Sequence, residues 1–72
     1  MNVDYARARD YYQQAAKQGV DTALFSLGEL YEYGKGVDID LFQALEYYRK
    51  AANAGDDEAP EKVEELRKLL NL

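Results

Sequence analysis

Residues 8–19, ARDYYQQAAKQG, return 36 residues later as residues 44–55, ALEYYRKAANAG. Both stretches carry an alanine, a tyrosine pair, an alanine pair and a closing glycine at the same spacing. Extended over all 72 residues, this register gives eleven identities, most of them small, aromatic or turn residues. A period of this size is typical of stacked helical repeats, in which each unit buries its apolar face against the next. The repeat therefore predicts an all-α fold.

The apolar spacing and the helix-ending signals divide the chain into four helices. Gly19 and Gly55 stand where a left-handed residue ends a helix. Asp21 is expected to cap the second helix, and Asp40 with Gln43 resembles a capping box at the start of the third. Because the connections are short, neighbouring helices must pack antiparallel, as a short α-α superhelix. We expect a single domain over residues 1–72, with helices near residues 4–18, 22–33, 40–54 and 58–70.

The repeated residues also predict how the helices pack. Gly28 and the alanine pairs at 15–16 and 51–52 remove bulk where a neighbouring axis comes close, while Tyr12 and Tyr48 fill the wider gaps. Small and large residues should therefore interdigitate between the helices.

The composition excludes several classes of function. The chain has no cysteine and no histidine, so the usual zinc ligands, a thiol nucleophile and the commonest general base are missing. Fourteen acidic and nine basic residues give a net charge of -5, which repels nucleic acid and anionic lipid. No stretch is long and apolar enough to span a bilayer, and the N-terminus has no basic, apolar leader. A cytoplasmic protein or a trimmed recombinant piece is expected, not a secreted protein and not a membrane partner.

Two strings of the sequence are similar to the Sel-one-like repeat, a relative of the tetratricopeptide repeat. They are Ala8-x-x-Tyr11-Tyr12-x-x-Ala15-Ala16-x-x-Gly19 and Ala23-x-x-x-Leu27-Gly28-x-x-Tyr31-x-x-Gly34-x-Gly36-Val37-x-x-Asp40. The first string recurs as Ala44-x-x-Tyr47-Tyr48-x-x-Ala51-Ala52-x-x-Gly55, so the resemblance covers roughly residues 4–66.

The resemblance implies an α-solenoid of helix pairs whose concave surface, lined by the first helix of each pair, holds proteins or peptides. Family members act as adaptors in signalling and degradation complexes. In family phase the chain begins with a second helix, and only residues 21–55 form a complete unit. The last helix departs from the pattern, with Glu64 in place of Gly28 and Arg67 in place of Tyr31, and resembles an idealised cap. Secreted members carry disulfides, which this sequence lacks.

Helical phase predicts one candidate binding surface, on the second and fourth helices. The face of the second helix opposite Leu27 and Leu30 and its counterpart 36 residues later would form a shallow groove. Phe25 and Tyr33 would be aromatic anchors, and the acidic rim would favour a basic or amphipathic peptide. Phe25→Ala is expected to weaken such a partner and leave stability nearly unchanged. The candidate partner-binding residues are Phe25, Ser26, Glu29, Glu32, Tyr33, Glu61, Lys62, Glu65, Lys68 and Leu69; a merely solvated face is the alternative.

Sequence features that suggest chemistry have simpler interpretations. Lys35 between two glycines lacks the strand and the Lys-Ser/Thr of a phosphate loop. Asp38 and Asp40 are too few for a divalent ion, and residues 56–58 lack the glycine and glutamate of a calcium loop. Some relatives were once described as β-lactamases, but no Ser-x-x-Lys motif occurs here. We therefore expect no catalytic residue, no metal site and no cofactor.

Two interpretations of function remain open. The first is a non-enzymatic protein-interaction scaffold that binds a protein or peptide on the groove. The second is a de novo or engineered helical repeat with a purely structural or self-assembling role. Weak self-association through the uncovered end helices would use Tyr5, Tyr11, Leu69, Leu70 and Leu72.

Overall fold

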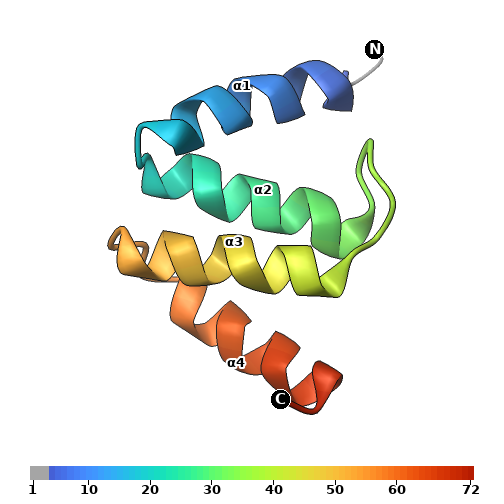
Figure 1. Ribbon diagram of the computed structural model, residues 1–72, viewed down its shortest axis with the longest axis vertical. Coiled ribbons are helices and arrows are strands. Elements are labelled where there is room, and N and C mark those ends of the chain that lie inside the picture. The colour runs from blue at the N-terminus through green and yellow to red at the C-terminus, as the bar shows by residue number, and fades with distance from the viewer. Residues whose placement is uncertain (1–3) are drawn as a thin grey trace.

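A computed structural model describes residues 4–72 as four successive helices. They are α1 (Tyr5–Lys17), α2 (Asp21–Tyr33), α3 (Leu41–Asn53) and α4 (Ala59–Leu70), and no strand occurs within residues 4–72. Figure 1 shows the helices stacked one after another along the long axis, with α1 and α4 at opposite ends of the stack and α4 inclined to α3. The all-α prediction is confirmed, and every predicted helix end lies within one residue of the observed end.

Aspartates and glycines set the helix ends. Asp4 and Asp40 act as N-caps: their Oδ1 atoms accept the backbone N–H of residues 7 and 43 at 3.0 and 3.1 Å. At the other end, Gly34 terminates α2 with φ of 69°, a left-handed conformation that L side chains rarely adopt. These local signals explain why the helix bounds can be predicted from the sequence.

Two helix caps differ in the structure from what the sequence predicts. Asp21 is the first residue of α2 and not its N-cap, which is Val20; the Asp21 carboxylate accepts only the adjacent Thr22 N–H, at 2.9 Å. The capping box at Asp40 is also incomplete. The Asp40 N–H donates to the Tyr31 carbonyl oxygen at 2.9 Å, so the Gln43 side chain has no amide left to accept from. This long-range bond instead joins the end of α2 to the start of α3.

The core lies where α2, α3 and α4 meet. Tyr48, Leu27 and Leu66 are fully buried, and the small residues Ala44 and Ala51 are fully buried beside them. The predicted alternation of small and large residues is seen most clearly at Gly28, where an added Cβ would lie 2.6 Å from Tyr48 Cε1. The α2 backbone can approach α3 this closely only because residue 28 has no side chain.

Helix α1 packs less closely against the rest of the protein than the other helices do. None of its residues is buried, although Ala16 packs against the cluster formed by Leu24, Ala51 and Ala59. Tyr12, expected to fill a gap between layers, is only partly buried. Within residues 4–72, every helix is too short and too polar to cross a bilayer.

Candidate functional site

Helices α2 and α4 form a shallow groove whose open end lies at their N-termini. Two adjoining depressions share Phe25 and Glu58 as lining residues. One extends over Ser26 and the loop before α4, and the other runs along α4 past Glu61 and Glu65. Six acidic side chains and one lysine line the two depressions. Each helix N-terminus contributes only about half a positive charge, so the open end of the groove stays strongly negative.

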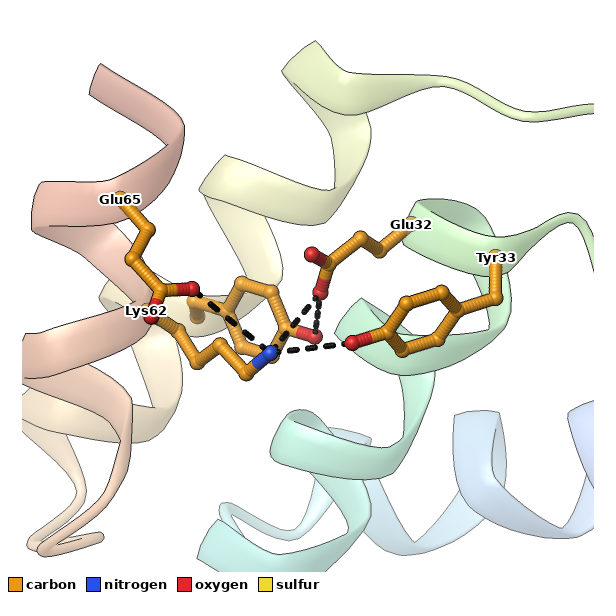
Figure 2. A network of polar contacts seen from close by, with 5 residues as sticks. Glu32, Tyr33, Lys62 and Glu65 are labelled. Carbon is orange, nitrogen blue, oxygen red and sulfur yellow. Dashed lines mark hydrogen bonds and ion pairs between the residues drawn. The ribbon is translucent and has the colours of Figure 1, made fainter. Parts of the chain in front are cut away.

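Farther along, a polar network bridges α2 and α4 (Figure 2). Lys62 reaches from α4 toward α2, where its Nζ donates to Tyr33 Oη at 3.1 Å and lies 3.5 Å from Glu32 Oε1. Glu65, one turn along α4, holds the same ammonium at 3.8 Å. The network limits the groove on this side, because Lys62 spans the space between the two helices.

Tyr48 of α3 connects this network to the core. Its hydroxyl donates to Glu32 Oε1 at 2.6 Å, while its ring is fully buried and lies 5.1 Å from the Phe25 ring, centroid to centroid. Burial raises the pKa of Tyr48 far above its usual value, and the hydrogen bond to Glu32 adds to this. The hydrogen bond with Tyr33 raises the pKa of Lys62. The folded protein therefore holds both protons more tightly than the unfolded chain does.

The network predicts a loss of stability at alkaline pH. The unfolded chain releases the Tyr48 proton near its usual pKa of 10.0 and the Lys62 proton near 10.5, whereas the folded protein retains the Tyr48 proton and has a raised pKa at Lys62. Because the folded state then binds more protons, the free energy of unfolding should fall above about pH 10, by up to about 1.4 kcal/mol per pH unit for Tyr48, and the raised pKa of Lys62 acts in the same direction. Urea melts between pH 7 and pH 11 measure this.

Tyr48→Phe is the matched control for the alkaline effect. It keeps the ring and removes the ionisable hydroxyl, so the variant should lose the tyrosine contribution to the slope. A stability that stays flat up to pH 11 in the unaltered protein would contradict the prediction.

The structure changes the role expected for Phe25. This side chain is only partly buried, but it packs against both core clusters as well as lining the groove. The expectation that Phe25→Ala leaves stability nearly unchanged is therefore wrong, because truncation would remove core contacts. Phe25 forms the apolar floor of the groove and is not an anchor standing free in solvent.

The other predicted site residues fall into four groups. Ser26 lies at the open end, and Glu61 and Glu65 line the α4 side. Glu29 lies close enough to the Tyr48 hydroxyl for its charge to help raise the pKa of that group. Lys68 and Leu69 belong to neither the depressions nor the network, and Leu69 is 71% exposed. The residues at the network end are Glu32, Tyr33 and Lys62.

Six residues that line the open end of the groove were not among the predicted site residues. The first helices of the two units begin at equivalent places in the repeat, so their N-terminal residues converge in space. The identity of Asp21 with Asp57 in the 36-residue register was the available signal. Asp56 is partly used by the fold, since its Oδ1 accepts the N–H groups of Glu58 and Ala59 at 2.9 and 3.1 Å. The missed residues are Asp21, Thr22, Gly55, Asp56, Asp57 and Glu58.

The acidic residues do not gather as a metal site. Across residues 4–72, no three carboxylates come together in an arrangement that could hold a metal ion. Asp40, half of the Asp-x-Asp pair, uses its carboxylate to cap α3.

Comparison with known proteins identifies the repeat. No curated protein and no solved structure matches the chain significantly. The sequence model of the Sel1 repeat matches residues 1–20 and 22–56. The second match spans α2 and α3 with their connections, and the first ends with α1, so the family phase has α1 as the closing helix of one unit and α4 as the opening helix of another. With four stacked helices, glycine-ended turns and this match over most of its length, the chain belongs to the Sel1 repeat family.

Proposed function

We propose that the protein is a non-enzymatic interaction module that binds a basic, amphipathic peptide in the groove between α2 and α4. Sel1 repeats generally mediate protein–protein interactions. The observation that carries the finer proposal is the lining of the groove, which combines an apolar floor at Phe25 with six acidic side chains and one lysine. The Lys62 ammonium already interacts with Glu32, Tyr33 and Glu65. It therefore neutralises little of the negative charge that the groove presents to a ligand.

The chemistry of the groove defines the kind of peptide that fits. An apolar side chain would contact the Phe25 ring, and lysine or arginine residues on either side would face Glu58, Glu61 and Glu65. These carboxylates are largely exposed, and the Debye length is about 8 Å at physiological ionic strength. The attraction should therefore raise the association rate and weaken as salt is added.

A charge-reversal pair tests the proposal. Glu61→Lys alters the groove, whereas Glu46→Lys makes the same change on an exposed part of α3 outside it. In fluorescence-anisotropy titrations with labelled, lysine-rich amphipathic peptides, we expect Glu61→Lys to weaken binding about tenfold and Glu46→Lys to have about a twofold effect. Equal losses for both variants would indicate non-specific attraction to an acidic protein. No measurable binding by the unaltered protein would reject the groove.

The structural alternative would use the ends of the stack instead of the groove. Tyr11, Leu69 and Leu72 are more than half exposed, at 69, 71 and 60%. A self-assembling repeat would bury these residues between copies, so a strict monomer in sedimentation velocity at high concentration would remove this alternative.

A further inference from the structure

A crevice lies between α1 and α3, with α2 forming its floor. Leu24 and Leu27 of the floor are 6% and 0% exposed, so the bottom of the crevice is apolar and well packed. Its volume is about 390 Å³, within the range of roughly 300–1,000 Å³ that is usual for ligand sites. It shares no lining residue with the groove between α2 and α4. The walls, which come from α1 and α3, carry Gln13, Lys17, Tyr47 and Lys50.

This lysine crevice is basic, although the chain as a whole is acidic. Lys17 stands on the α1 wall and Lys50 on the α3 wall, and no acidic residue lines the space between them. Neither ammonium forms an ion pair with a carboxylate of residues 4–72. Both lysines lie in the last turns of their helices, where each C-terminus carries about half a negative charge, so about one positive charge remains. An anionic ligand would therefore be attracted to the crevice.

The aromatic side chain of the α3 wall is held in position. The Tyr47 ring stacks on the Tyr31 ring with centroids 5.7 Å apart and an interplanar angle of 15°. Lys50 Nζ lies over the same Tyr47 ring, 5.7 Å from its centroid. Because these contacts already restrict both side chains, less conformational entropy is lost when a ligand binds against them.

The internal repeat separates the shape of the crevice from its charge. Five of the lining positions recur 36 residues later, and the equivalent residues line a depression between α3 and α4. In that depression asparagine stands in place of Lys17, and Glu64 is among the lining residues. The repeat therefore explains the shape, whereas the lysine pair belongs to the crevice between α1 and α3. The five equivalent residues are Arg49, Ala52, Asn53, Pro60 and Val63.

We propose that the lysine crevice binds an acidic segment of a partner protein, in which an apolar side chain lies between carboxylates. The apolar side chain would enter over Leu24 and Leu27, and the carboxylates would pair with Lys17 and Lys50 on the two walls. Both lysines are exposed, so the crevice is open to solvent. An extended protein segment therefore fits it better than a small molecule, which a binding site normally encloses.

The net charge of -5 does not prevent such binding. The carboxylates that produce it lie outside the crevice, and the Debye length is about 8 Å at physiological ionic strength. The two lysines therefore dominate the field at short range. The expected ligand has the opposite charge from the ligand proposed for the groove, so this inference does not rest on that proposal, and failure at one site leaves the other undecided.

An acidic peptide with a single leucine, Gly-Glu-Glu-Leu-Glu-Glu-Gly, is the probe. Its few contacts make weak binding the expectation, so NMR titration of the 72-residue protein is the appropriate method. We expect saturable shifts at the amides of Lys17, Leu24, Tyr47 and Lys50. Glutamines in place of the glutamates, or serine in place of the leucine, should each weaken binding about tenfold, because charge and apolar contact both contribute.

Lys17→Glu and Lys68→Glu form a matched pair of protein variants. Both lysines are exposed and lie in the last turn of a helix, α1 and α4 respectively, so the two charge reversals have similar effects on the helix dipole. Only Lys17 lines the crevice. Lys17→Glu should weaken the peptide about tenfold or more, and Lys68→Glu should change its affinity by less than about twofold. The peptide comparison leaves the protein unaltered, so it remains decisive if Lys17→Glu fails to fold.

Four results would overturn the proposal. The first is the absence of saturable shifts at the crevice, including shifts confined to Phe25 and Glu61, which would place the peptide in the groove. The second is equal binding of the glutamine or serine peptide, and the third is an equal loss for Lys17→Glu and Lys68→Glu. The fourth is a dimer in sedimentation velocity that Lys17→Glu dissolves, which would identify a second copy of the chain as the occupant.

Discussion

Tyr48→Ala is expected to lower the free energy of unfolding by about 3 to 5 kcal/mol, the usual cost of truncating a fully buried aromatic residue. The ring is 0% exposed and contacts α2 through Phe25 and Gly28 and α4 through Leu66. Its removal would leave a cavity where three helices meet. A domain of 72 residues has a total stability of roughly 4 to 10 kcal/mol, so the variant should be largely unfolded or close to it at 37 °C.

Tyr48→Phe separates packing from hydrogen bonding at the same position. It keeps the ring and removes the hydroxyl that donates to Glu32 at 2.6 Å. Because Glu32 still has Lys62 as a partner, we expect a smaller loss, roughly 1.5 to 3 kcal/mol. Urea denaturation followed by circular dichroism at 222 nm measures both variants. Losses of equal size would mean that the ring contributes little, contrary to its burial.

Gly28→Leu is expected to destabilise the fold by roughly 1 to 3 kcal/mol through overpacking. A Cβ at this position would lie 2.6 to 2.9 Å from three atoms of the Tyr48 ring. The ring has no room to move away, because it is fully buried and its hydroxyl is held by Glu32. The better helix propensity of leucine would offset part of the loss, about 1 kcal/mol at most. Thermal and urea melts give the net effect.

A double-mutant cycle tests the physical cause. If the clash with the ring dominates, Gly28→Leu should be much less harmful in a Tyr48→Ala background, where the leucine can enter the cavity. The double variant should then lose less stability than the sum of the losses in the two single variants. Strict additivity, or a neutral Gly28→Leu, would show that α2 does not present residue 28 to α3.

The helix bounds could be predicted to within one residue because the signals that set them are local. Asp4 and Asp40 accept amides three residues away, and Gly34 adopts the left-handed conformation that ends α2. Tyr48 and Ala51, both predicted to pack between helices, are likewise fully buried in α3. A pattern with a period near 3.6 residues is sufficient for such predictions, since each helix needs only one apolar face.

The candidate site was only partly predictable, since several of its interactions join residues far apart in sequence. Lys62 contacts Glu32 and Tyr33, which lie 30 and 29 residues away in the sequence. The hydrogen bond from Tyr48 to Glu32 joins residues 16 positions apart. Helical phase placed Glu32, Tyr33 and Lys62 on one surface, but it could not decide that they bind one another. It also assigned Phe25 to that surface without showing that the ring reaches the core.

The amino-acid sequence by itself determined the four helices, their ends and the order of small and large residues, because these depend on neighbours within one or two turns. Tertiary structure alone decided which copy of the repeated tyrosine pair is enclosed. Tyr11 and Tyr12 lie in the same repeated motif, Ala-x-x-Tyr-Tyr-x-x-Ala-Ala, as Tyr47 and Tyr48. The second pair is packed by α2 and α4, whereas the outer face of the first pair has no covering helix among residues 4–72. Burial depends on which elements surround a side chain, and an internal repeat at the end of a stack leaves one of its copies open.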